Sequence, residues 1–136
     1  MNSRKAVVYA ALVLGVLLFG RVSLVYLFDT ATAAVRANLQ PASPVGLGNL
    51  RVFAGAFHLA VCLTTVAGLI YQRYATAALA NLVIVTLTVA ATRWLGAQVD
   101  GDVARVPAVV ETSALVIFAL ALWIGTRGKS ADMQPA

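Results

Sequence analysis

The stretch AVVYAALVLGVLLFGRVSLVYLF, residues 6–28, decides the fold class of this chain. It is apolar almost throughout and long enough to cross the hydrocarbon core of a bilayer, which takes about 20 helical residues. Hydrocarbon offers no partner to an unpaired backbone amide or carbonyl, so a run of this kind must be helical. Three more such runs follow, at 50–71, 75–96 and 106–126. The sequence therefore predicts an all-α integral membrane protein, a bundle of four transmembrane helices forming a single domain over residues 1–136.

The composition excludes several other classes of protein. Of the 136 residues, 61% are apolar and 11% are charged, whereas roughly a quarter are charged in soluble domains. The single cysteine, Cys62, and the single histidine, His58, leave no internal disulfide, CxxC motif or bis-histidine site. The basic residues behind the net charge of +5 are scattered, without an aromatic platform for nucleic acid. We therefore expect no cofactor, no metal and no nucleic-acid partner.

Positive charge is distributed unequally around the four runs. Four crossings place both termini on one side, and that side is predicted to be cytoplasmic because basic flanks stay inside. A cleaved signal peptide over the first run is the alternative, but the apolar stretch resumes after Arg21 and is too long for one. The basic residues on the predicted cytoplasmic side are Arg4, Lys5, Arg73, Arg127 and Lys129.

The segments outside the runs are short. The outer loop, residues 29–48, has helix-forming composition over 31–39, which predicts a short interfacial helix. Proline and glycine then predict a break in regular structure over 40–48, with Asn49 as the cap of the second long helix. A turn is expected at 99–102, and the tail 128–136 is expected to be disordered. The small-residue pairs Ala56/Ala60 and Ala121/Gly125 are weak indications of close helix packing.

Ionisable residues inside the runs are functional candidates, because charge in a bilayer is costly. All five lie in the half of the bundle away from the termini, and we treat them as a hypothetical ligand site. In the second run, polar or small residues recur at spacings of four, three, four and three, which keeps them on one helix face. That stripe is Arg51, Gly55, His58, Cys62 and Thr65. The five candidate site residues are Arg21, Arg51, His58, Arg93 and Glu111.

Each candidate also has a structural interpretation. Arg51 and Arg93 stand near helix ends, where the side chain can reach the headgroups. Glu111 can pair with one arginine to hold the bundle together, and His58 can be a hydrogen-bonded interhelical residue. Against this, three arginines and one glutamate in the same half predict a cationic pocket. An anionic group, such as a lipid phosphate or a carboxylate, would balance it.

The chain resembles a known family between Leu47 and Trp123. Asn49-Leu50-Arg51, followed by Gly55 and Phe57, is similar to the opening of the second helix in the bacterial membrane family called domain of unknown function 4345. Arg73, Arg93 with Asp100-Gly101, and Pro107 with Glu111 match that family's pattern in order. The resemblance implies four transmembrane helices in a bacterial inner membrane, and it implies no activity. The chain is also distantly similar to DoxX-like proteins, some of which are associated with quinone-linked oxidation.

Three functional hypotheses follow from these features. The preferred one is a non-enzymatic protein that binds an anionic lipid or another amphipathic ligand in an outer-leaflet polar pocket. The second is a membrane subunit of a quinone-linked oxidoreductase whose redox cofactor sits on a partner chain. The third is an accessory or assembly subunit of a larger membrane complex. Membrane lipid is the expected partner in all three, and the chain can also form a homo-oligomer.

Overall fold

The structure is a computed structural model that describes residues 3–39, 43–100 and 105–131. Every regular element in these ranges is helical, and no strand occurs among them. The prediction of an all-α protein is therefore confirmed. The elements in chain order are α1 (Ser3–Phe28), α2 (Thr30–Arg36), α3 (Pro44–Leu50), the π-helix η1 (Arg51–Ala56), α4 (Phe57–Ile70), the 3-10 turn η2 (Gln72–Tyr74), α5 (Ala75–Asp100) and α6 (Arg105–Ala131).

Four helical stretches are long and apolar enough to cross a membrane, as the sequence predicts. The second combines α3, η1 and α4 into one continuous stretch, and the third joins η2 to α5. Large apolar side chains such as Leu17, Phe53 and Leu95 are more than half exposed on them, which suits lipid as the surrounding solvent. The stretches are Ser3–Phe28, Pro44–Ile70, Gln72–Val99 and Val106–Arg127.

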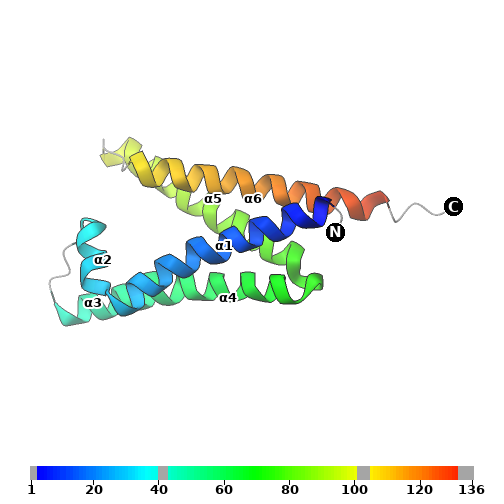
Figure 1. Ribbon diagram of the computed structural model, residues 1–136. Helices are drawn as coiled ribbons and strands as arrows, with labels where there is room; N and C mark the ends of the chain where they lie inside the picture. The colour runs from blue at the N-terminus through cyan, green and yellow to red at the C-terminus, as the bar shows by residue number, and fades with distance from the viewer. Residues whose placement is uncertain (1–2, 40–42, 101–104, 132–136) are drawn as a thin grey trace.

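The long helices alternate in direction along the bundle (Figure 1). α1 packs against α4, α5 and α6, and α5 packs against α4 and α6. The start of α1 and the end of α6 lie at the same end of the molecule, which we call the terminus end (Figure 1). α2, α3, the end of α5 and the start of α6 lie at the opposite end, which we call the loop end. The predicted candidate residues all lie in the half nearer the loop end.

The second long helix begins earlier than the sequence predicts. The expected break is wrong from Pro44 to Gly48, and the expected cap at Asn49 is wrong, because α3 begins at Pro44 and Ser43 caps it. The Ser43 hydroxyl accepts a hydrogen bond from the Gly46 amide, with an O···N distance of 3.2 Å. A proline in the first helical position lacks only an amide that has no partner there anyway, so it starts a helix readily. Residues 40–42 lie outside the described residues.

The short helix predicted in the outer loop is present as α2. It buries Thr30 and Ala34 against the end of α1. Asn38 ends it with a positive φ of 56°, a left-handed conformation that asparagine tolerates better than most residues. The Leu39 amide then donates to the Ala34 carbonyl at 2.8 Å, which closes the helix end.

The last two long helices extend past their predicted ends. α5 continues through Asp100, so the first half of the turn expected at 99–102 is helical. α6 continues to Ala131, so the disorder expected from residue 128 is wrong for 128–131. The rest of the expected turn, the Gly101 of the family pattern and the tail 132–136 lie outside the described residues.

Small residues bring the helices close together between the middle of the bundle and the terminus end. A Cβ atom built on Gly68 would lie 2.5 Å from the Cβ of Ala78, so α4 and α5 touch there through their backbones. Ala121 is buried, and a Cβ on Gly125 would lie 3.1 Å from Val8 of α1, which confirms that pair as a packing site. The other predicted pair is wrong, because Ala56 and Ala60 are both exposed.

Candidate functional site

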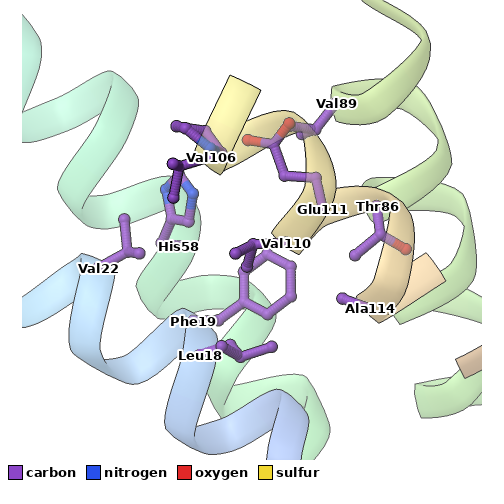
Figure 2. Close-up of a pocket in the computed structure, with 11 residues that line it drawn as sticks. Leu18, Phe19, Val22, His58, Thr86, Val89, Val106, Val110, Glu111 and Ala114 are labelled. Atoms are coloured by element: carbon purple, nitrogen blue, oxygen red, sulfur yellow. The ribbon is translucent and has the colours of Figure 1, made fainter. Parts of the chain in front are cut away.

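A pocket of about 340 Å³ opens between α1, α4, α5 and α6 in the loop-end half. We call it the loop-end pocket. The His58 ring and the Glu111 carboxylate lie toward one end of it, whereas Leu18 and Ala114 lie toward the other (Figure 2). Its volume is near the lower end of the range for ligand sites, about 300 to 1,000 Å³. The lining residues are Leu18, Phe19, Val22, His58, Thr86, Val89, Val106, Pro107, Val110, Glu111 and Ala114.

Glu111 is joined to Arg93 by a two-armed ion pair. Arg93 Nε donates to Oε2 at 2.5 Å, and Nη2 donates to Oε1 at 2.6 Å. The pair links α6 to α5 near the loop end, and the neighbouring Trp94 Nε1 donates to the Thr112 hydroxyl at 3.3 Å across the same interface. The predicted pairing of Glu111 with one arginine is therefore confirmed. Glu111, the single charged residue among the described side chains that line the pocket, is thus already neutralised.

His58 is held against its own helix. Its Nδ1 lies 2.5 Å from the Ala54 carbonyl oxygen. A carbonyl only accepts, so Nδ1 must carry a proton and donate. The ring also contacts Phe19 of α1, with 5.7 Å between ring centroids, and meets Phe57 edge-on at 5.6 Å. These contacts fix both the tautomer and the orientation of the imidazole.

Two backbone carbonyls of the π-helix η1 accept side-chain hydrogen bonds at this level of the bundle. A π turn bonds each amide five residues back instead of four, which disturbs the regular pattern of an α-helix, and such turns are frequent at functional sites. The Ala54 carbonyl accepts from His58, and the Gly55 carbonyl accepts from the Ser23 hydroxyl of α1 at 3.0 Å. Both bonds come from side chains, and the second ties α1 to η1.

The same π turn explains why Arg51 leaves the predicted stripe. Gly55, Cys62 and Thr65 are buried and His58 is half-buried, as the α-helical spacing predicts. Arg51 is exposed, because a residue in a wider turn advances by less than the 100° that the spacing assumed. The predicted inward-facing stripe is therefore confirmed from residue 55 onward, and the prediction is wrong for Arg51, its first member.

Arg21 also faces away from the pocket. It is exposed on α1 in register with Leu17, Leu24 and Phe28, which are exposed as well, so it shares their outward face. Neither Arg21 nor Arg51 is among the residues that line the loop-end pocket. Of the five candidates, the structure brings together Arg93 and Glu111 as a pair, and His58 and Glu111 around one pocket.

Several residues of the site are not among the sequence candidates. Phe19 packs on the His58 ring, and Ser23 reaches the Gly55 carbonyl. The sequence signal that could have found them is their spacing of four residues on α1. This spacing puts the hydroxyl of Ser23 and the ring of Phe19 on the same, buried face of the helix. Thr86 is buried in the pocket wall, but its hydroxyl donates to the Leu82 carbonyl at 2.6 Å and is not free.

The described residues contain no group of three or more histidine, cysteine or acidic side chains able to hold a metal. Cys62 is buried, with its Sγ 3.7 Å from the Val16 carbonyl. A second hollow of about 320 Å³ lies between α4 and α5 nearer the terminus end, beside the hydrogen bond from Asn81 to Thr64. The loop-end pocket is the better candidate for a ligand, because all four long helices contribute to its walls, whereas the second hollow is lined from α4, η2 and α5.

No family model, curated protein or solved structure matches this chain. The fold itself defines the class, which is a small all-helical protein with four helices fit for a multi-pass membrane arrangement. The resemblance to domain of unknown function 4345 stays a prediction.

Proposed function

We propose that this protein binds an amphipathic, lipid-like molecule from the bilayer in the loop-end pocket. The observation that carries the proposal is the pocket's division into two parts. Its walls are mostly apolar side chains from α1, α5 and α6, whereas His58 of α4 and Glu111 of α6 supply polar groups toward one end. A molecule with an apolar body and a polar head fits such a site without leaving either part in the wrong environment.

The charge of the site favours a hydrogen-bonding head over a strongly anionic one. Glu111 and Arg93 neutralise each other, and the two other intramembrane arginines are exposed and do not line the pocket. The anionic lipid expected from three arginines would therefore meet no unpaired positive charge from the lining side chains that the structure describes. An anionic ligand is one of the outcomes that the test below separates.

The proposed setting is a bacterial inner membrane with both termini in the cytoplasm. The support is the excess of basic residues in the flanks at the terminus end, since positive flanks stay inside. Arg73 and Arg127 stand there on exposed faces, stacked over the rings of Tyr74 and Trp123. In this orientation the loop-end pocket belongs to the outer leaflet half.

Native mass spectrometry of the gently solubilised protein tests the proposal. Val110→Trp places a large ring at the pocket, and Val109→Trp places the same ring on an exposed position of α6 outside it. We expect a bound amphiphile in the native protein and in Val109→Trp, and its loss in Val110→Trp. A bare chain, or a ligand retained equally by both variants, would refute the proposal.

The same spectra distinguish the alternatives drawn from the sequence. A bound quinone would favour the subunit of a quinone-linked oxidoreductase, and an absorbance spectrum of a co-purifying partner would reveal the cofactor. Co-purifying chains without a ligand would favour an accessory subunit. A phospholipid lost on Arg51→Ala but kept by Val110→Trp would move the ligand site to the exposed arginines.

A further inference from the structure

The backbone of η1 determines which nitrogen of His58 is available to a ligand. Because Nδ1 donates its proton to the Ala54 carbonyl, a neutral His58 carries no proton on Nε2. Nε2 is therefore a hydrogen-bond acceptor. This assignment follows from the acceptor being a carbonyl oxygen, which cannot donate in return.

Nε2 has no hydrogen-bond partner among the described residues. It is also not sealed in the interior, since no buried side-chain nitrogen or oxygen in the described part of the chain lacks a partner. Nε2 is thus an unpaired acceptor with open space beside it, on a residue that lines the loop-end pocket. In hydrocarbon, an unpaired acceptor gains free energy from any donor that reaches it.

The other polar side chains of the pocket are already engaged. Each carboxylate oxygen of Glu111 accepts a hydrogen bond from Arg93, and the Thr86 hydroxyl gives its proton to the Leu82 carbonyl. Among the described lining residues, His58 is therefore the one whose side chain presents an acceptor atom that takes part in no hydrogen bond.

We infer that the loop-end pocket selects amphiphiles whose head carries a hydroxyl group, with the hydroxyl donating to Nε2 of His58. The inference rests on the proposed binding function and adds the chemical class of the ligand. Long-chain alcohols, isoprenoid alcohols and quinols share this donor. Ethers, esters and quinones present acceptors alone, and a carboxylate would meet the lone pair of Nε2 and a glutamate already neutralised by Arg93.

The single histidine makes a direct test possible on the unaltered protein. Labelling with ¹⁵N-histidine gives one pair of ring-nitrogen resonances, because the chain contains one histidine. The protein is placed in nanodiscs at a mildly alkaline pH. The probes are 1-dodecanol, its methyl ether and dodecanoate, which share a chain and differ in the head.

We expect the free protein to show a protonated Nδ1 and an unprotonated Nε2. Added dodecanol should shift the Nε2 resonance, whereas the methyl ether should leave it in place. In titrations, dodecanol should bind about fivefold more tightly than the ether, as one buried hydrogen bond allows.

Variants separate the hydrogen bond from the apolar part of the site. His58→Asn keeps a short donor for the Ala54 carbonyl but presents nothing at the position of Nε2, and His58→Phe keeps the ring without nitrogen. In both, the preference for dodecanol over the ether should fall to about onefold. The Nε2 resonance test needs no variant, so it stays decisive if a variant does not fold.

The outcomes are distinct for the two proposals. Equal binding of alcohol and ether, tighter binding of dodecanoate, or a proton on Nε2 would overturn the hydroxyl preference and leave the binding function standing. If none of the probes bound, or if Val110→Trp bound all of them as well as the native protein, the proposed function itself would fall.

Discussion

The two halves of the bundle are held together in different ways. Toward the terminus end, α4 and α5 meet through Gly68 and Ala78, and α1 and α6 meet through Val8 and Gly125, so the contacts are mainly steric, with one side-chain hydrogen bond from Asn81 to Thr64. Toward the loop end, the same helices are joined by side-chain hydrogen bonds and an ion pair. Arg93 holds Glu111 across α5 and α6, and Ser23 holds Gly55 across α1 and η1.

This difference shows where the chain keeps room for a ligand. Lipid provides little hydrophobic drive between helices, so small residues that allow close contact are an efficient way to hold a membrane bundle. A glycine contact of that kind leaves no space at its own level, and the second hollow lies beside it. Polar contacts fix helices at a few points and let them stand apart elsewhere, and the loop-end pocket lies between such points.

The largest expected effect comes from breaking the ion pair in the loop-end half. Glu111→Leu leaves Arg93 without its partner in an apolar surrounding, which should destabilise the protein by about 2 to 3 kcal/mol. This is below the cost for a fully buried pair, because the two side chains keep 32% and 20% of their surface. Unfolding by SDS in mixed micelles measures it.

The matched control for the ion pair is the double variant Arg93→Met with Glu111→Leu. It removes both charges and should recover most of the lost stability, since no unpaired charge remains. If Glu111→Leu alone cost nothing, the loop-end half would not depend on this contact.

A smaller effect is expected from a single methyl group in the terminus-end half. Gly68→Ala forces a Cβ to within 2.5 Å of the Ala78 Cβ, which has no flexible end to move aside. Overpacking of this kind should cost about 1 to 2 kcal/mol. Thermal unfolding of the detergent-solubilised protein, followed by circular dichroism, would detect it.

Gly48→Ala is the control for that substitution. Gly48 is also helical, but a Cβ there meets nothing within 4 Å. The change should leave stability unaltered or raise it by up to about 1 kcal/mol, because alanine favours the helix. Equal losses at both positions would mean that close packing does not distinguish the terminus-end half.

The smallest effect is expected from the hydrogen bond between α1 and η1. Ser23→Ala removes the donor to the Gly55 carbonyl and should cost about 0.6 kcal/mol, a typical value for an interhelical side-chain bond in a membrane. Hydrogen exchange of the η1 amides would show the loosening locally. Ser113→Ala, on an exposed position of α6, should leave both the stability and the exchange of the η1 amides unchanged. A similar loss of stability in Ser113→Ala would show that the Ser23 hydrogen bond does not hold α1 against η1.

The candidate site was predictable in part. Glu111, Arg93 and His58 stood out because ionisable residues are rare in apolar runs, and a preference for pairing followed from their opposite charges. Which arginine would meet Glu111 was not predictable. Arg21, Arg51 and Arg93 are equivalent by composition, and the choice depends on which helix faces which.

The helix ends, like the candidate site, were predictable only in part. Ser43 followed by Pro44 is a helix cap with a proline in the first helical position, so the start of α3 was predictable from the sequence. The glycines that follow indicated a break instead. No comparable sequence motif predicts the π turn over Arg51–Ala56. Two of its carbonyls accept side-chain hydrogen bonds, one of them from Ser23 of α1, 32 residues away.

By itself the sequence determined the all-α class and the four membrane-length helices. Both are local properties, since a run of apolar residues must satisfy its own backbone in hydrocarbon. The tertiary structure alone decided that Arg93 and not Arg21 or Arg51 pairs with Glu111, and that η1 fixes the proton of His58 on Nδ1. These outcomes depend on the rotation of each helix about its own axis, which only packing against the neighbouring helices sets.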